Sequence, residues 1–165
     1  MNPSPPRAPV VIRPYEATRD DEALRALNVE HQDFSRTLEP TWPSGKSVVD
    51  EYLAFLKREC AAHDGDVFMA EVGGRAAGFV CVVAATQGES PDDPAVFAWI
   101  HDIFVRPEHR RQGVATALMA AAESFARSRG ARELRLGVID RNADARALYG
   151  RLGFRDYTRV LTKRL

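Results

Sequence analysis

The sequence of 165 residues has few cysteines and no excess of charge of either sign. Its two cysteines, Cys60 and Cys81, cannot form a disulfide framework, and both lie within apolar patterns; we therefore expect buried, reduced thiols in a cytoplasmic protein. The 23 basic residues balance 23 acidic ones, which argues against a domain that coats nucleic acid or an anionic membrane. The longest apolar run, Phe79–Ala85, is too short to span a bilayer, and the N-terminus lacks a signal-peptide pattern.

Several common motifs for binding phosphate or metal are also missing. There is no GxxxxGK[ST] sequence, and no GxGxxG follows the first predicted strand. The four histidines are scattered without an HxxxH or CxxC spacing, so no metal site is expected. No GxSxG sequence is present either. These absences argue against a nucleotide triphosphatase, a dinucleotide-dependent oxidoreductase, a metalloenzyme and a serine hydrolase with a nucleophile elbow.

Hydrophobic periodicity predicts one α+β domain, residues 10–165, after a disordered proline-rich tail, residues 1–9. Gly73-Gly74 between two apolar runs predicts a tight hairpin. The order of elements is βααβββαβαβ, which indicates a mixed, mostly antiparallel sheet flanked by helices, an α/β sandwich. In chain order we predict a strand at 10–13, a helix at 20–33, a loop at 34–46, a helix at 47–62 capped by Ser47, strands at 66–72, 75–84 and 95–105, a helix at 113–129, a strand at 132–139, a helix that Asn142 opens and Gly153 ends, and a last strand at 154–165.

The segment from Ile100 to Ala115 is the most informative about function. A strand is followed by a short charged loop, and Arg110-Arg111-Gln112-Gly113 then opens a helix. The first turn of a helix has unpaired N–H groups and attracts phosphate. The small side chains at Gly113 and Ala115 would let a diphosphate approach the backbone. An ordinary helix start with two solvated arginines is the alternative explanation.

Two motifs resemble the signatures of the GNAT superfamily of acetyl-CoA-dependent N-acetyltransferases. The first is [QR]-x-x-G-x-[GA] at the start of a helix, matched here by Arg110, Gly113 and Ala115. The second is an asparagine-opened helix that ends in tyrosine and then Gly-Phe, matched by residues 142–154. The predicted elements follow the same fold, so the resemblance covers nearly the whole chain. It implies that the fourth and fifth strands splay apart and open a V-shaped cleft.

The resemblance also implies how acetyl-CoA would bind as a cosubstrate. Pantetheine would lie in the cleft and pair with strand backbone, as an added strand would. The diphosphate would meet backbone N–H groups at the helix start. No metal is implied. The implied cofactor-binding residues are Ile103, Phe104, Val105, Arg110, Arg111, Gln112, Gly113, Val114, Ala115, Thr116, Asn142 and Tyr149.

The implied chemistry is direct attack of a primary amine on the thioester. A backbone N–H near Phe104 or Val105 would stabilise the oxyanion, and Tyr149 would protonate the CoA thiolate. An alkylamine is mostly protonated at neutral pH, so a base is needed, and His101 and Asp102 are the candidates. Neighbouring residues of a strand point to opposite faces, so we expect at most one of the two to face the substrate. Alternatively, Tyr149 merely packs against its neighbours, and His101 and Asp102 have only structural roles.

The signals for the acceptor amine are weaker. A rim of acidic residues would suit a small cationic amine such as a polyamine, an aminoglycoside or a lysine-like group, although a solvated surface explains the same residues. The alternatives are a protein N-terminal or lysine acetyltransferase acting on a peptide amine, and a non-catalytic acyl-CoA-binding sensor or interaction module. Neither nucleic acid nor membrane is expected as a partner, and the family is compatible with a homodimer. The acidic residues are Glu30, Asp33, Glu39, Glu89, Asp92 and Asp93.

Overall fold

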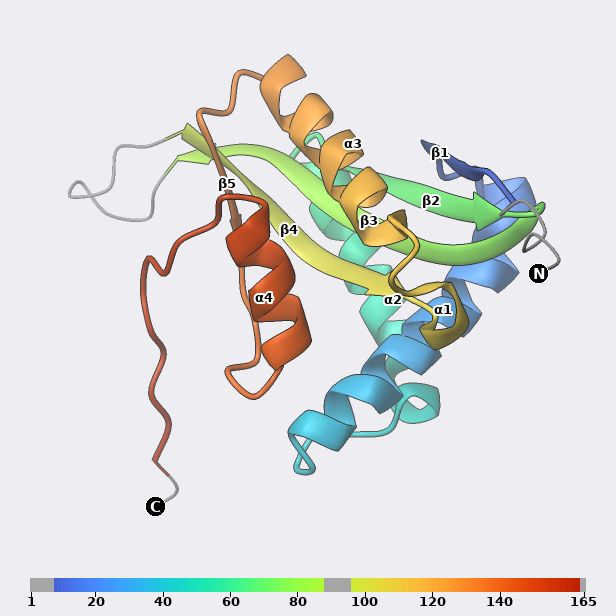
Figure 1. Cartoon of the computed structure of the whole chain (residues 1–165), viewed down its shortest axis with the longest axis horizontal. Coiled ribbons are helices and arrows are strands. Elements are labelled where there is room, and N and C mark those ends of the chain that lie inside the picture. Colours follow the sequence, from blue (N-terminus) through green and yellow to red (C-terminus); the bar gives the residue numbers. More distant parts are fainter. Residues whose placement is uncertain (1–7, 88–95, 164–165) are drawn as a thin grey trace, which may run out of the picture.

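Five strands form one mixed sheet in the order β1-β2-β3-β4-β5 (Figure 1). The computed structural model describes residues 8–87 and 96–163. The first four strands pair as antiparallel neighbours, and the fifth pairs in parallel with β4. The strands are β1 (Val10–Pro14), β2 (Asp66–Val72), β3 (Arg75–Gln87), β4 (Val96–Val105) and β5 (Glu133–Leu136).

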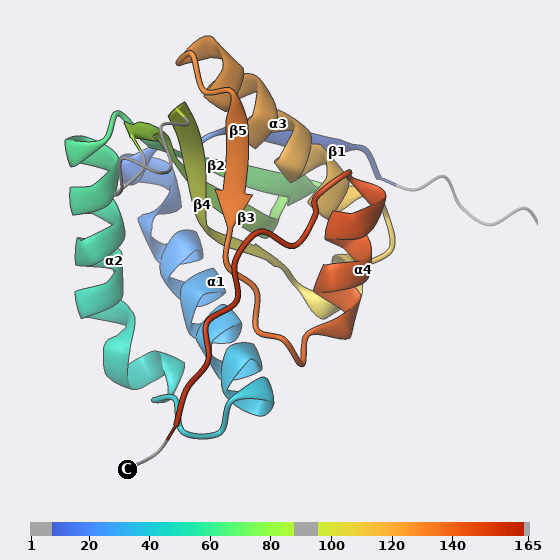
Figure 2. The same cartoon turned by 90° about the vertical axis from the view of Figure 1, so that its left-hand side faces the viewer.

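Helices cover both faces of this sheet, α1 and α2 on one face and α3 and α4 on the other (Figure 2). The apolar core is accordingly divided in two. Leu118 and Met119 are fully buried under α3, and Leu27 and Phe79 are fully buried between the sheet and α1. The helices are α1 (Ala17–Leu38), α2 (Gly45–Ala62), the 3-10 turn η1 (Pro107–His109), α3 (Val114–Ser128) and α4 (Ala143–Arg151).

The predicted α+β arrangement and the β2–β3 hairpin are confirmed. Gly73 and Gly74 both have positive φ, 58° and 75°, as a tight two-residue hairpin turn requires. The start of α2 differs from the prediction, because the helix begins at Gly45 rather than at Ser47. Its first N–H is held by the Asp33 carboxylate of α1 at 2.8 Å, a cap from another helix that local sequence patterns do not reveal.

Further boundaries were predicted wrongly: α1 begins at Ala17 rather than residue 20, and β5 ends at Leu136 rather than residue 139. Helix α1 continues from residue 33 to Leu38, because no helix breaker occurs before Pro40. Residues 154–163 form no strand, and Val160 and Leu161 are 93% and 86% exposed. A β-forming sequence needs a partner strand to complete its hydrogen bonds, and this segment has none among the described residues. Most of the predicted tail, residues 1–7, lies outside the described residues.

Candidate active site

Strand β4 carries one extra residue at His101, which interrupts its pairing with β3. Cys81 lies opposite Asp102, whereas the next residue of β3, Val82, lies opposite Ile100. His101 is therefore left without a partner, as in a β-bulge. Because side chains alternate along a strand, one extra residue changes which side chains share a face.

As a result, His101 and Asp102 both face α2. The His101 ring packs against Phe55 of α2, with ring centroids 5.5 Å apart at an interplanar angle of 90°. Asp102 accepts a hydrogen bond from the Tyr52 hydroxyl of α2 at 2.7 Å. The expectation that these neighbours point to opposite faces is therefore wrong, and the bulge is the physical reason.

Beyond the bulge, β4 and β5 separate. Their parallel pairing ends at Ile100 opposite Leu136, yet β4 continues to Val105 (Figure 1). Over these last residues β4 still pairs with β3 on one side, and on the other side it has no strand among residues 8–87 and 96–163. The predicted splay between the fourth and fifth strands is confirmed, and it creates an open edge of β4.

The register decides which backbone groups lie on this open edge. The Arg106 N–H bonds to the Ala77 carbonyl of β3 at 2.9 Å. In an antiparallel ladder, hydrogen-bonded and non-hydrogen-bonded pairs alternate, so Phe104 also directs its N–H and C=O toward β3. The backbone groups of Ile103 and Val105 point the other way, toward the open edge.

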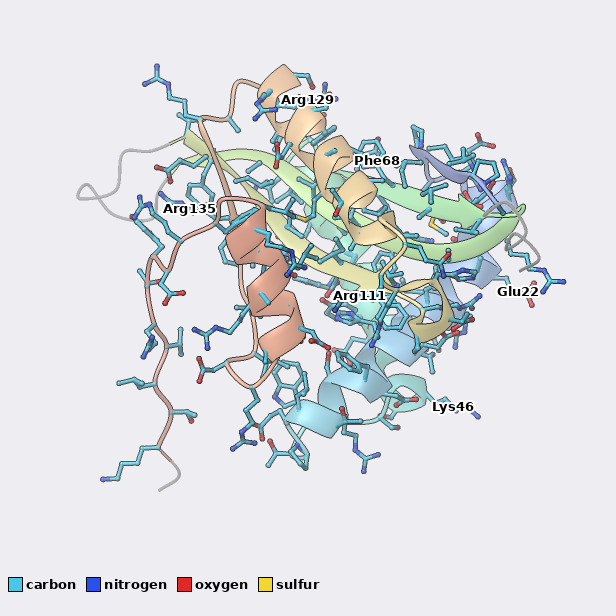
Figure 3. The ribbon with its side chains drawn as sticks, viewed as in Figure 1. Glu22, Lys46, Phe68, Arg111, Arg129 and Arg135 are labelled. Atoms are coloured by element: carbon cyan, nitrogen blue, oxygen red, sulfur yellow. The ribbon has the colours of Figure 1, made fainter. Side chains whose placement is uncertain are left out.

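Two arginines follow this edge, in different settings. The Arg110 Nε donates to the Val105 carbonyl at 3.0 Å, and its guanidinium lies 4.7 Å from the centre of the Phe34 ring of α1. Arg110 thus anchors the loop to β4 and α1. Arg111 is exposed on the loop that precedes α3 (Figure 3). It has a positive φ of 59°, an unusual conformation for a residue with a side chain.

The start of α3 presents bare backbone. Gly113 has φ 84°, and the helix has no side-chain cap at this end. The Ala117 N–H bonds to the Gly113 carbonyl at 2.9 Å, so the N–H groups between these two residues have no partner within the helix. A Cβ on Gly113 would meet nothing within 4 Å. An open strand edge beside uncovered amides fits a pantetheine arm followed by a diphosphate.

Tyr149 and Asn142 both belong to α4, the last helix. Burial, together with the charge of Asp102, raises the pKa of Tyr149 to about 12. The phenol hydroxyl has no hydrogen-bond partner among the described residues. Asn142 begins the helix as predicted, and its Oδ1 accepts from the Ala145 N–H at 3.2 Å.

Sequence reasoning missed His31 and Tyr52, which surround Asp102. The Asp102 side chain is only 7% exposed, and its Oδ1 lies 3.4 Å from His31 Nδ1. Burial and the nearby carboxylate raise the pKa of Tyr52, which stays a neutral donor. A signal for His31 did exist: with Leu24, Leu27 and Phe34 it occupies the inward stripe of α1, where an apolar residue is expected.

His101 is in a different environment from His31. Its Nε2 is fully buried without a hydrogen bond and lies 3.7 Å from Glu59 Oε2. Burial lowers the pKa of His101, although Asp102 and Glu59 oppose this effect. The neutral imidazole is therefore favoured.

The described part of the acidic rim is already engaged with protein groups. Glu30 pairs with Arg106 at 2.8 Å, and Asp33 caps α2. Glu39 accepts from the Thr41 hydroxyl at 2.8 Å. The other three acidic residues, 89, 92 and 93, lie outside the described residues. Within residues 8–87 and 96–163, no helix has the length and apolar character needed to cross a membrane, and no three His, Cys, Asp or Glu side chains gather as a metal ion would require.

Comparison with known proteins accounts for this arrangement. The model of the acetyltransferase (GNAT) family matches residues 30–154, most of the chain. The chain belongs to the GNAT family. Solved structures agree with this GNAT fold: an acetyltransferase from Pyrococcus furiosus superposes with a TM-score of 0.74 at 19% identity, covering 95% of this chain and 100% of that one. An aminoglycoside N-acetyltransferase in complex with CoA gives a TM-score of 0.73 at 26% identity, covering 98% of both chains.

Curated relatives carry several activities. A mycothiol acetyltransferase of Thermobispora bispora is 32% identical over 90% of this GNAT chain, which spans only 48% of that protein. The aminoglycoside N(6')-acetyltransferase type 1 of Salmonella typhimurium is 28% identical over 84% of this chain and 94% of that protein. The thialysine N-epsilon-acetyltransferase of Bos taurus is 38% identical over 36% of this chain and 35% of that protein.

Proposed function

We propose that this GNAT domain transfers the acetyl group of acetyl-CoA to a primary amine. The observation that carries the proposal is the open edge of β4 beside the uncovered amides at Gly113. Acetyl-CoA supplies the acetyl group as an activated thioester. A CoA complex of a structural neighbour with 98% coverage supports the same ligand class here.

The coenzyme would be held mainly by backbone. The Ile103 carbonyl and the Val105 N–H pair with the amide groups of pantetheine as an added strand would. The amides that follow Gly113, from Val114 to Thr116, receive the diphosphate, and the exposed Arg111 adds charge from the side. The remaining predicted contacts support the site rather than bind the coenzyme directly. Arg110 anchors the loop to the Val105 carbonyl, and Gln112 donates to the Glu108 carbonyl at 2.8 Å. The Phe104 side chain is buried beneath β4, and Asn142 positions the start of α4.

The oxyanion donor follows from the register. The Phe104 N–H is directed at β3, so it is not available to a ligand on the open edge. The Ile103 N–H is the donor on the open edge next to Asp102. We assign it to the carbonyl oxygen of the thioester, where a fixed N–H stabilises developing negative charge.

Proton transfer needs a donor and an acceptor. Tyr149 keeps its proton at neutral pH because its pKa is about 12, so it is available to protonate the departing sulfur. An alkylammonium with an ordinary pKa loses its proton at a cost of about 4–5 kcal/mol at pH 7. The attacking amine would be deprotonated at the polar cluster around Asp102, on the α1 and α2 side of β4.

A small cationic amine is the proposed acceptor. Relatives named for aminoglycosides and for thialysine support this class, since both substrates carry amines that are cationic at neutral pH. The buried Asp102 carboxylate supplies negative charge close to the splay. A peptide amine is the competing substrate, and the experiment below distinguishes between the two.

The test is an acetylation screen with the purified chain. Polyamines, aminoglycosides, lysine-like amino acids and short peptides are each incubated with acetyl-CoA, and acetylated products are identified by mass spectrometry. We expect at least one small cationic amine to be acetylated faster than the peptides. Tight binding of acetyl-CoA without acetylation of any amine would identify a non-catalytic acyl-CoA-binding module instead.

A further inference from the structure

His31 of α1 and Asp102 of β4 form a pair beneath the open edge of β4. The His31 Nδ1 lies 3.4 Å from Asp102 Oδ1, and the His31 side chain is 22% exposed against 7% for Asp102. The imidazole ring packs beside Phe79 and Phe104, with ring centroids 6.3 and 5.6 Å away. Because these rings hold the imidazole in place, its position is defined, while its partial exposure leaves it accessible to a substrate.

Among the groups around this pair, Asp102 is the one that carries negative charge beside His31. Tyr52 of α2 donates to Asp102 Oδ2 at 2.7 Å, and burial raises the pKa of this phenol. Cys81 of β3 lies opposite Asp102, and its hydrogen bond with Cys60, together with burial, raises the pKa of the Cys81 thiol. Both neighbours are therefore neutral at pH 7. The positive guanidinium of Arg110 lies 5.8 Å from the centre of the Phe104 ring.

We propose that His31 is the base that takes the proton from the attacking amine, with Asp102 as its positioning residue. This inference rests on the proposed function. A carboxylate beside Nδ1 favours the tautomer with its proton on that nitrogen, which leaves the lone pair of Nε2 for the amine. The carboxylate oxygen, 3.4 Å from Nδ1, also lies close enough to attract the imidazolium that forms.

The step balances as follows. The amine nitrogen forms a bond to the acetyl carbon, and the carbon–sulfur bond breaks. The alkylammonium first releases one proton to solvent. A second nitrogen proton moves to His31 Nε2 as the amide forms, and the Tyr149 proton moves to the sulfur. Exchange with solvent then returns a proton to Tyr149 and removes one from His31.

His101 fits this role less well than His31. The Nε2 of His101 is fully buried and lies 3.7 Å from Glu59 Oε2, whereas the carboxylate beside His31 lies at Nδ1 and the His31 side chain is 22% exposed. The sequence motif drew attention to His101 because it lies on β4, but the bulge turns its ring against Phe55.

The experiment uses the amine found in the screen and five variants, two at His31 and one each at Asp102, His63 and His101. We expect His31→Ala to lower kcat/KM for the amine by about 100-fold or more, with the acetyl-CoA dissociation constant unchanged by calorimetry. Added imidazole should restore at least part of the lost rate, which a purely structural role would not allow. His31→Asn, which keeps an N–H donor toward Asp102, serves if the alanine variant does not fold. Asp102→Asn should also lower kcat/KM, and the exposed His63→Ala is the control without effect.

The outcomes separate the two proposals. If the wild-type chain acetylates no amine, the proposed function fails, and the assignment of His31 fails with it. If the wild-type chain is active and His31→Ala keeps its rate, or loses it without rescue by imidazole, the role of His31 alone is overturned. Loss of activity in His101→Ala together with imidazole rescue of that variant would move the base to His101.

A second inference rests on a separate observation, the contact between Cys60 of α2 and Cys81 of β3. Their sulfur atoms lie 3.6 Å apart, and Cys60 is half-buried while Cys81 is buried. A disulfide needs a sulfur separation of about 2.05 Å, so a shift of about 1.5 Å would close it. The hydrogen bond from Cys81 lowers the pKa of Cys60, which increases its thiolate fraction.

We infer that this pair is a modification site for hydroperoxides. The Cys60 thiolate would attack hydrogen peroxide and become a sulfenic acid, and the hydroxide that leaves would take a proton from solvent to form water. The Cys81 thiol would then displace a second water to form the disulfide. Hydrogen peroxide should therefore remove two hydrogens from the intact mass and link the two cysteine peptides. Cys81→Ser should instead accumulate a Cys60 sulfenic acid that dimedone traps, and Cys60→Ser should show neither product. Recovery of both free thiols from the folded wild-type chain, or oxidation of Cys60 without linkage, would refute the inference.

Discussion

Replacing Tyr149 with phenylalanine tests the assignment of the general acid. The change keeps the ring, whose centroid lies 5.7 Å from that of Phe154, and removes a hydroxyl that has no hydrogen-bond partner among the described residues. We therefore expect the stability to change by less than about 0.5 kcal/mol at pH 7. The turnover number should fall by about 10²–10⁴-fold, which corresponds to about 3–5 kcal/mol of lost transition-state stabilisation. Affinity for acetyl-CoA should be nearly unchanged.

The pKa of Tyr149 provides an independent check that needs no substrate. Folding raises this pKa from 10.0 to about 12, so the stability that the neutral phenol contributes is complete below pH 10 and is lost as the pH rises toward 12. A shift of this size corresponds to at most about 2–3 kcal/mol. Urea unfolding from pH 9 to 11.5 should show the wild type losing more stability than Tyr149→Phe.

The control for both measurements is Tyr157→Phe, because Tyr157 is 53% exposed. It should behave as the wild type in turnover and in the pH dependence of unfolding. Undiminished turnover in Tyr149→Phe would refute the role as acid. A pH dependence of unfolding identical to that of the wild type would refute the burial of the phenol.

Three further predictions concern the backbone and the loop. Gly113→Ala and Gly130→Ala both place a side chain at positive φ, 84° and 81°, so each should lower the free energy of unfolding by about 1–2 kcal/mol in urea. Only Gly113→Ala should also weaken coenzyme binding, by at least tenfold in calorimetry. Equal affinities of the two variants would contradict a coenzyme site at the start of α3. Arg111→Asn is suitable because asparagine tolerates positive φ. The variant should bind CoA less tightly than the wild type but pantetheine equally well, and the loss of CoA affinity should shrink in high salt. A loss of CoA affinity that salt does not reduce would argue against a phosphate contact. Gly45→Ala places a Cβ 2.4 Å from the Val29 carbonyl oxygen of α1 and should destabilise the folded protein by more than about 2 kcal/mol. Gly150→Ala, in open space within α4, should stabilise it by up to about 1 kcal/mol. Unfolding curves that rank the two variants the other way would show that α1 and α2 are not packed this closely.

The parts of the fold that local patterns decide were predicted well. Apolar spacing located α3, and the two glycines at positive φ located the β2–β3 turn. The order of the first nine predicted elements followed from the same signals. These features depend on residues a few positions apart, so a short stretch of sequence is enough to predict them.

The features that were missed depend on residues far apart in the chain. The bulge at His101 exists only relative to β3, so the sequence of β4 alone cannot show that Asp102 shares its face. Asp33 caps a helix other than its own, and His31 reaches Asp102 across 71 positions. The last strand was predicted from β propensity, but propensity does not supply a partner strand.

The five C-terminal residues of β4 have a consequence for the protein without its ligand. Exposed strand backbone is a template on which other chains can pair, and natural proteins usually blunt it with charge, proline or a covering segment. Here Pro107 comes just after the strand, and the stretch Ile103-Phe104-Val105 is entirely apolar. Bound coenzyme would occupy this template and, at a hundredfold excess over its dissociation constant, add about 2.7 kcal/mol of stability. Coenzyme should therefore act as a solubilising agent during purification, and aggregation in its absence should begin at this strand.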